Sequence, residues 1–209
     1  MKKTFLTLIM SVAAISVSFA ASPLISYSGE VNVGFATGNK IRYENTATES
    51  ALHRPFVETI HGVNIAKFAF IGAGLGVQGY FGAVDTAVPD VKWETVTMPL
   101  FVNVKGQLPL KSVTPYISAS FGGTIIPYCG QNISTEILGV RAESKLTGGF
   151  YCVCGVGVKL IDKINIGVGM QHQQFGSKLI VKDGSYSEVE RDDDYRHGTS
   201  FYVKVGFCW

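Results

Sequence analysis

The chain has 209 residues, of which 46 % are hydrophobic and only 16 % are charged, and its formal net charge is +2. Soluble proteins carry about 25 % charged residues, so this composition argues against an ordinary soluble domain. A net charge this small also creates no global field that would attract nucleic acid, and we expect no nucleic-acid partner.

The first 20 residues have the pattern of a secretory signal peptide. Lys2-Lys3 precede an apolar stretch, Phe5–Val17, and Ser18-Phe19-Ala20 supply the small residues of a cleavage site. We therefore assign 1–20 to a signal peptide and 21–209 to one mature domain. Losing two lysines leaves 16 basic residues against 16 acidic ones, a mature net charge of zero.

The mature chain contains no apolar run near the ~20 residues of a membrane helix, but it alternates polar and apolar residues with period two. In the first such stretch, Val31, Val33 and Phe35 share one face, whereas Glu30 and Asn32 share the other. The predicted strands are Leu24–Ala36, Pro55–Ile65, Phe68–Phe81, Thr95–Lys105, Thr114–Ile126, Thr147–Leu160, Ile164–Phe175 and Phe201–Trp209. Each is near or above the ~9–11 residues that a tilted strand needs to cross a bilayer.

Pro99 lies inside the fourth predicted strand. Proline has no backbone N–H to donate to a neighbouring strand, so we expect a bulge or kink there.

The connections between these strands alternate in length. Long polar loops are predicted after strands one, three, five and seven, at Thr37–His53, Gly82–Glu94, Pro127–Leu146 and Ser177–His197. The other connections are short turns. This layout is typical of an outer-membrane barrel, which has short periplasmic turns and long outer loops.

The charged residues of the predicted strands all fall on the face opposite the aliphatic one. They are Glu30, Glu58, Lys105, Lys159 and Lys204. A soluble barrel would turn its apolar face inward, so the pattern indicates lipid as the outer solvent. The predicted fold is all-β: a membrane-spanning antiparallel up-and-down β-barrel of about eight strands, closed because an open edge cannot persist in hydrocarbon.

Five stretches carry a resemblance to a known family. They are Gly29–Phe35, Glu58–Gly62, Gly72–Gly76, Pro99–Phe101 and the terminal strand. The mature chain resembles the small outer-membrane barrels grouped as the outer membrane protein beta-barrel domain or porin family, abundant in Bacteroidetes. The resemblance implies a location in the outer membrane of a Gram-negative bacterium, with lipid and lipopolysaccharide as neighbours, and no common enzymatic activity.

The terminal strand resembles the closing strand of outer-membrane barrels. Its apolar face consists of Phe201, Val203, Val205, Phe207 and Trp209. In such barrels the terminal aromatic strand is read by the barrel assembly machinery, and the resemblance implies the same partner here.

The interior of an eight-stranded barrel is filled by its own side chains. The inward aromatic residues expected to fill this one are Phe56, Phe101, Tyr116, Tyr151 and Tyr202. Inward charges need partners. With Trp209 set beside Leu24 in the closing pair of strands, Glu30 comes near Lys204, and we predict this structural ion pair, with Glu58 sharing it.

Residues that suggest catalysis or metal binding are few. Some eight-stranded barrels edit lipid A with a Ser and a His near the outer rim; His172 lies there, but Gln174 occupies the place of the serine. The carboxylates of the 177–197 loop lack the spacing and glycine of a calcium loop. Cys152 and Cys154 share one strand face, and we interpret the four cysteines as small apolar residues. We expect no metal and no cofactor.

A short motif in the second loop, Asp85-Thr86-Ala87, resembles the O-glycosylation signal of exported Bacteroidetes proteins. The resemblance implies a surface glycan on Thr86.

The sequence favours a non-enzymatic barrel with a structural or surface-interaction role, because outer loops are the variable, partner-facing part of such folds. The alternatives are a narrow porin-like channel for small solutes and a lipid A-modifying barrel enzyme. No extracellular partner is indicated.

Overall fold

A computed structural model describes residues 24–42, 52–83, 92–110, 112–129, 134–137, 140–182 and 188–209, with side chains over 24–38, 53–81, 95–110, 112–128, 147–176 and 198–209. The proposed signal peptide lies outside the described residues. The strands are β1 (Ile25–Arg42), β2 (Leu52–Ile65), β3 (Ala69–Ala83), β4 (Lys92–Gln107), β5 (Val113–Cys129), β6 (Ser134–Ile137), β7 (Val140–Leu160), β8 (Ile164–Lys182) and β9 (Glu188–Cys208).

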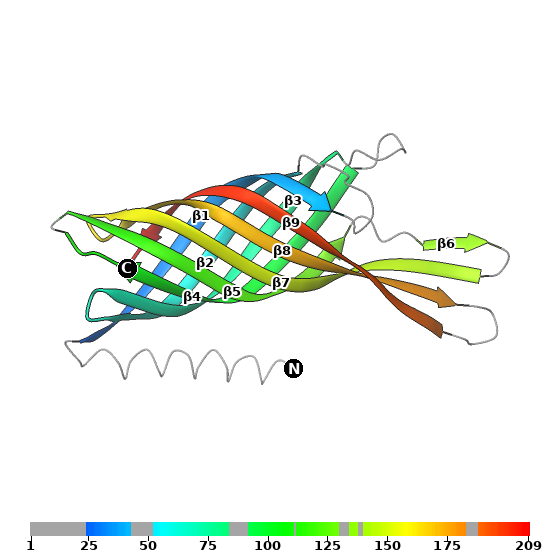
Figure 1. The fold of residues 1–209 in the computed structure, drawn as a ribbon, viewed down its shortest axis with the longest axis horizontal. Coiled ribbons are helices and arrows are strands. Elements are labelled where there is room, and N and C mark those ends of the chain that lie inside the picture. The colour runs from blue at the N-terminus through cyan, green and yellow to red at the C-terminus, as the bar shows by residue number, and fades with distance from the viewer. Residues whose placement is uncertain are drawn as a thin grey trace.

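Eight of these strands close into a barrel in which every pairing is antiparallel (Figure 1). Neighbours along the chain pair with each other, β5 pairs with β7, and β1 pairs with β9 to complete the ring. The short strand β6 stands outside the ring and pairs with the distal end of β7. The predicted up-and-down barrel of eight strands is confirmed.

The short connections gather at one end of the barrel. Ala66 and Lys67 between β2 and β3, and Ile161 and Asp162 between β7 and β8, have φ between 50° and 64°. Two successive positive φ values are the mark of a type I′ turn, whose twist suits a hairpin. Leu24 and Trp209 lie at this same end, where Ala66 N–H donates to the Leu24 carbonyl at 2.7 Å (Figure 1). We refer to it as the turn end.

At the opposite end the strands continue well beyond their predicted limits. Strands continue into all four predicted loops, since β1 runs to Arg42 and β4 starts at Lys92. Most of 127–146 and of 177–197 is strand, because β7 starts at Val140 and β9 starts at Glu188. The sequence-based limits followed the apolar alternation, which stops before the strands end. Backbone pairing needs no apolar side chain and goes on into the polar segments.

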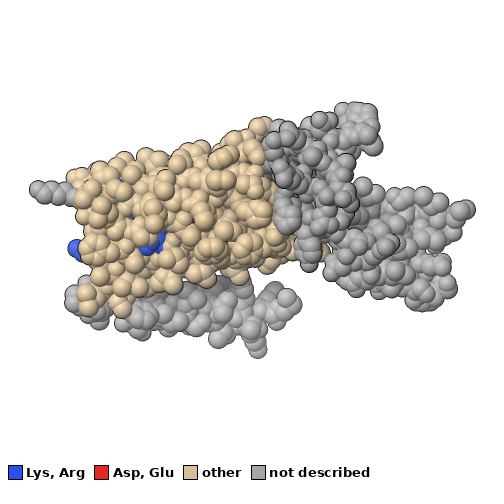
Figure 2. Space-filling model, viewed as in Figure 1, with Lys and Arg blue, Asp and Glu red and all other residues tan. Residues whose placement is uncertain are grey.

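The wall of the barrel is apolar outside and polar inside. Val203 and Val205 of β9 and Ile166 and Val168 of β8 are 40–53 % exposed. The five charged residues predicted to face inward are at most 7 % exposed. On the face seen in Figure 2, the described wall shows basic residues only as small patches near the turn end. This inside-out sorting is that of a protein whose outer solvent is lipid.

The backbone around Pro99 is irregular, as predicted. The register between β4 and β5 shifts by one residue between Val96 and Met98, immediately before the proline. Pro99 itself faces the lumen and is buried.

Within the described residues, no helix is long and apolar enough to cross a membrane.

Candidate functional site

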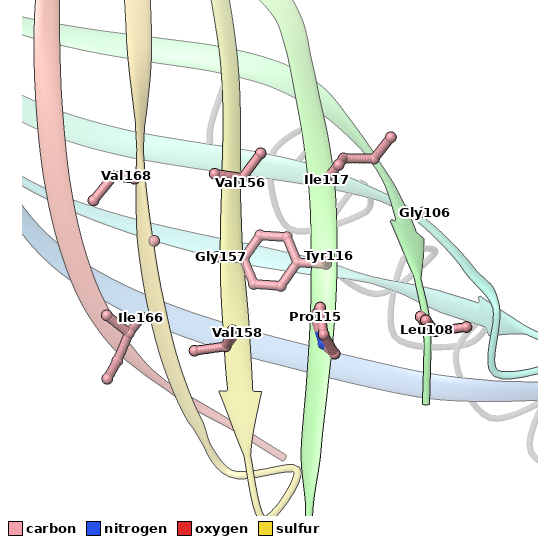
Figure 3. A pocket seen from close by; sticks show the side chains of 11 residues that line it. Gly106, Leu108, Pro115, Tyr116, Ile117, Val156, Gly157, Val158, Ile166 and Val168 are labelled. Atoms are coloured by element: carbon pink, nitrogen blue, oxygen red, sulfur yellow. The ribbon is translucent and has the colours of Figure 1, made fainter. Parts of the chain in front are cut away.

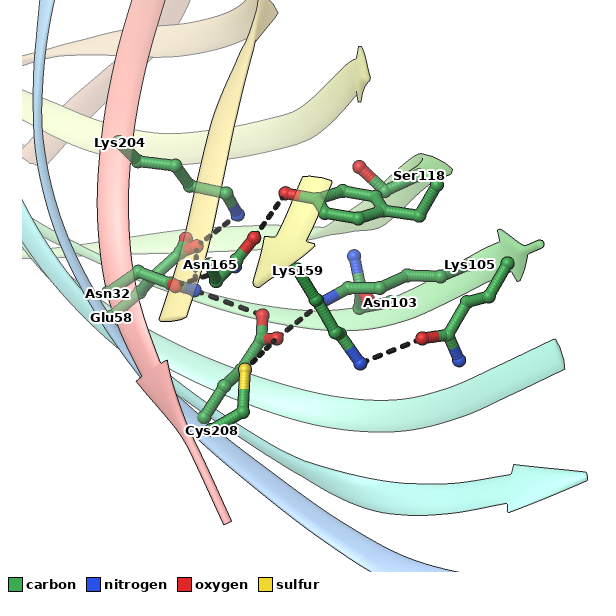
Figure 4. Close-up of polar contacts among 12 residues, drawn as sticks. Asn32, Glu58, Asn103, Lys105, Ser118, Lys159, Asn165, Lys204 and Cys208 are labelled. Atoms are coloured by element: carbon green, nitrogen blue, oxygen red, sulfur yellow. Dashed lines mark hydrogen bonds and ion pairs between the residues drawn. The ribbon is translucent and has the colours of Figure 1, made fainter. Parts of the chain in front are cut away.

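The lumen near the turn end holds two ion pairs, one on each side of an asparagine. Lys105 Nζ lies 2.5 Å from Glu30 Oε2, and Lys204 Nζ lies 2.7 Å from Glu58 Oε1. The amide of Asn32 donates to both carboxylates at 3.0 Å (Figure 4). All five side chains are buried, so each charge is compensated where water is excluded.

The three residues of the predicted ion pair, Glu30, Glu58 and Lys204, therefore lie in one cluster, but the ion pairs that they form differ from the predicted pair. The sequence reasoning set Trp209 beside Leu24, whereas Trp209 exchanges two backbone hydrogen bonds of 3.0 Å with Gly29. Because the closing strands are shifted in this way, Lys204 lies opposite Gly34 and reaches Glu58 rather than Glu30. Glu30 is paired across the lumen with Lys105, which had been predicted to face inward but not to be its partner.

A second set of amides and a tyrosine fixes this cluster to β5 and β8. Tyr116 donates to Asn165 Oδ1 at 2.6 Å, and Asn165 Nδ2 donates to Asn32 Oδ1 at 2.9 Å. Cys208 Sγ lies 3.9 Å from Glu30 Oε2. Every polar atom of Asn32 is thus engaged, which makes this residue the centre of the network (Figure 4).

An aromatic layer fills the lumen above the ion pairs. The rings of Phe101 and Tyr151 lie 5.5 Å apart, and those of Phe56 and Tyr202 meet edge to face at 6.1 Å. Together with Tyr116, these are the five aromatic residues predicted to face inward, and all are buried. A cavity of about 10 Å³ remains between this layer and Glu58, which is scarcely the volume of one water molecule.

The lumen beyond the aromatic layer contains a cation that the sequence reasoning missed. Arg54 is 1 % exposed, and it donates to the Tyr80 hydroxyl at 2.8 Å and to Ser200 Oγ at 2.9 Å. Its guanidinium also lies 5.2 Å from the centre of the Tyr80 ring. Arg54 had been left just outside the second predicted strand. The alternation of side chains along a strand could have identified it, because Arg54 lies two residues before Phe56 and four before Glu58, which both face inward.

A cavity of about 520 Å³ opens at the turn end, and we call it the mouth cavity. It is lined by Ser26, Tyr27, Ser28, Asn64, Lys67, Gln107, Pro109, Leu110, Thr114, Lys159, Asp162 and Trp209. The next inward residues of β1 and β4 are Glu30 and Lys105, whose ion pair forms a floor beneath it.

A depression of about 530 Å³ lies on the outer wall near the same end. It is lined by Gly106, Leu108, Pro115, Tyr116, Ile117, Val156, Gly157, Val158, Ile166, Gly167 and Val168. Gly106 faces outward without a side chain, and the Tyr116 ring reaches from β5 to Gly157 of β7 (Figure 3). Its side chains belong mainly to the outward apolar set, so the depression is part of the lipid-facing surface.

The remaining predicted residues fall in several places. His172 is half-buried, with its Nδ1 3.1 Å from Thr199 Oγ1. Cys152, Cys154 and Cys208 are free thiols, of which Cys154 faces outward. Thr86 lies outside the described residues, as do the side chains of Cys129 and of the charged 177–197 segment. Among the described residues, no group of three His, Cys, Asp or Glu side chains is arranged to hold a metal ion.

No protein-family model and no curated protein matches the chain. Among solved structures, the chain is similar to the outer membrane enzyme PagL, with 12 % identity and a TM-score of 0.45 over 83 % of this chain and 97 % of that one. It is similar to Neisserial surface protein A, with 12 % identity and a TM-score of 0.47 over 88 % and 97 %. The outer membrane protein AlkL, solved in lipid bilayers, gives 8 % identity and a TM-score of 0.45 over 88 % and 89 %.

Proposed function

We propose that the protein is a non-enzymatic integral barrel of a Gram-negative outer membrane, with a structural or surface-interaction role carried by its outer hairpins. It is a small barrel of the porin-family type found in Bacteroidetes, and it reaches the membrane after removal of residues 1–20. The turn end faces the periplasm. Lipid and lipopolysaccharide surround the wall, and the assembly machinery binds the outward face of β9.

The filled lumen is the observation that carries this proposal. The aromatic layer formed by Phe56, Phe101, Tyr151 and Tyr202 leaves a cavity of about 10 Å³, far too small for a solute. Beneath it lie two buried ion pairs, Lys105 with Glu30 and Lys204 with Glu58. A barrel built in this way offers the medium its outer surface and its hairpins rather than a passage.

Planar-bilayer recording tests this reading against the narrow channel. Refolded protein is expected to give no conductance steps. The matched variant combines Tyr151→Ala with Phe101→Ala. It removes two neighbouring rings of the aromatic layer and leaves the strands of the barrel wall unchanged. Steps in the unmodified protein would support the channel for small solutes and would refute the plugged barrel.

The orientation and the surface role are tested with inserted epitope tags. A tag placed within residues 183–187, between β8 and β9, is expected to bind antibody on intact cells. A control tag in the Ile161–Lys163 turn should bind only after the outer membrane is permeabilised. The reverse pattern would overturn the proposed orientation.

The non-enzymatic assignment is tested on lipid A. Cells that express the protein and cells that express His172→Ala are expected to have identical lipid A mass spectra. A loss of acyl chains that depends on His172 would establish the lipid A-modifying alternative.

A further inference from the structure

The mouth cavity contains a hydrogen-bonded chain whose direction is imposed by a lysine. Lys159 Nζ donates to Gln107 Oε1 at 2.7 Å, and Gln107 Nε2 donates to Asn64 Oδ1 at 3.0 Å. An ammonium group can only donate, so the oxygen of Gln107 must face Lys159 and its amide group must face the oxygen of Asn64. The Nδ2 amide of Asn64 is then left at the far end of the chain, on the cavity lining.

Both ends of this chain consequently present donors to the cavity. Lys159 has three N–H bonds, of which Gln107 takes one, and Asn64 offers its NH₂ group. The hydroxyl groups of Ser26 and Ser28 line the same space. These donors line the cavity together with one side-chain carboxylate, that of Asp162, and they suit a ligand that is rich in acceptors.

The pairing of charges in the lumen also favours a ligand that is rich in acceptors. Lys105 and Lys204 each have a carboxylate partner. Lys159 is only 6 % exposed, and its hydrogen-bond partner in the described part of the chain is the neutral Gln107. Among the described residues, Asp162 is the one side-chain carboxylate on the lining, and it accepts a hydrogen bond of 3.5 Å from Thr114.

We propose that the mouth cavity is a binding site for the phosphate group of a small organic phosphate. The phosphate lies against Lys159 and Asn64. Lysine is a common point-charge partner of phosphate, and a tetrahedral oxyanion can accept from several donors around it. The volume of about 520 Å³ exceeds that of the bare anion and falls in the range of small-molecule pockets, roughly 300–1,000 Å³. Pro109 and Leu110 supply apolar lining for the organic part.

Trp209 makes this proposal measurable, because this residue is on the lining of the mouth cavity and its indole packs over Gly29, next to Ser28 of the lining. The chain has two tryptophans, and Trp93 lies near the opposite end of β4. In a Trp93→Phe background, purified barrel in detergent is titrated with sn-glycerol 3-phosphate, inorganic phosphate, acetate and glycerol. We expect saturable fluorescence changes with the two phosphates, and none with glycerol. Equal affinity for acetate would overturn the phosphate assignment.

Three variants assign the effect to the site. Lys159→Met and Asn64→Asp are each expected to weaken sn-glycerol 3-phosphate binding by roughly tenfold or more, since each removes a donor to a charged group. Lys163→Met removes an equal charge from the same end but not from the cavity lining, and it should bind like the parent protein. Far-UV circular dichroism and thermal melting establish that the variants are folded.

Unchanged affinity in folded Lys159→Met, or no saturable binding in the parent protein, would refute the proposal. The measurement uses isolated barrel, so its result is independent of the proposed role at the cell surface.

Discussion

Replacing Glu58 with leucine tests the charge pairing inside the barrel. The substitution leaves Lys204 buried without its carboxylate partner at 2.7 Å and also removes one of the two acceptors of Asn32. Breaking a buried ion pair in this way costs about 3–5 kcal/mol. Lys204→Met should cost a similar amount, because it leaves the Glu58 charge without its cation.

The double variant, Glu58→Leu with Lys204→Met, measures the interaction free energy between the two side chains. Because neither charge then remains, about 1–3 kcal/mol of the summed single losses should be recovered. The assay is urea unfolding of the barrel in lipid vesicles, followed by tryptophan fluorescence and extrapolated linearly to zero denaturant.

The matched comparison is Glu30→Leu with Lys204→Met. Since Glu30 pairs with Lys105, its coupling to Lys204 should be the weaker of the two. Single losses below about 1 kcal/mol, or strict additivity for Glu58 and Lys204, would refute the argument. So would a stronger coupling of Lys204 to Glu30, which would instead support the pairing expected from sequence.

Two further predictions concern the inner and outer surfaces of the wall. A Cβ added at Gly155 would lie 2.8 Å from the Val168 carbonyl oxygen and closer still to the Tyr202 hydroxyl. Gly155→Ala should therefore lower the free energy of unfolding by about 1–3 kcal/mol. The control is Gly123→Ala, which should cause no such loss, because the nearest atom to its added Cβ is 3.9 Å away. Val205 is the central residue of the outward face of β9. In vesicles, Val205→Arg should lower the free energy of unfolding by about 2–4 kcal/mol, whereas Ile65→Arg, beside the turn, should lower it by about 0–1 kcal/mol. Equal losses at Gly155 and Gly123 would contradict the tight inner packing, and equal tolerance of both arginines would contradict a hydrocarbon environment.

The direction in which side chains point could be derived from the sequence within the predicted strands. Side chains alternate across a strand, so parity alone placed Glu30 and Lys204 inside and Val203 and Val205 outside, as the structure has them. The same rule would have placed Arg54 inside, but the predicted strand started at Pro55, three residues after the observed start at Leu52.

Strand length was harder to derive, because the apolar alternation ends before the strands do. The segment 140–146 contains Arg141, Glu143 and Lys145 and was interpreted as loop, yet it pairs with β8 as far as Lys182. Hydrogen bonding between backbones continues there without any requirement on the side chains.

The sequence by itself determined which face of each strand meets lipid, the order of the strands and the aromatic filling of the lumen, because these follow from local alternation and from the spacing of turns. Only the tertiary structure decided that Lys204 pairs with Glu58 and Lys105 with Glu30, and that Lys159 is left facing the mouth cavity. These contacts cross the lumen, and they depend on how far β1 and β9 are shifted when the barrel closes, a displacement that no single strand encodes.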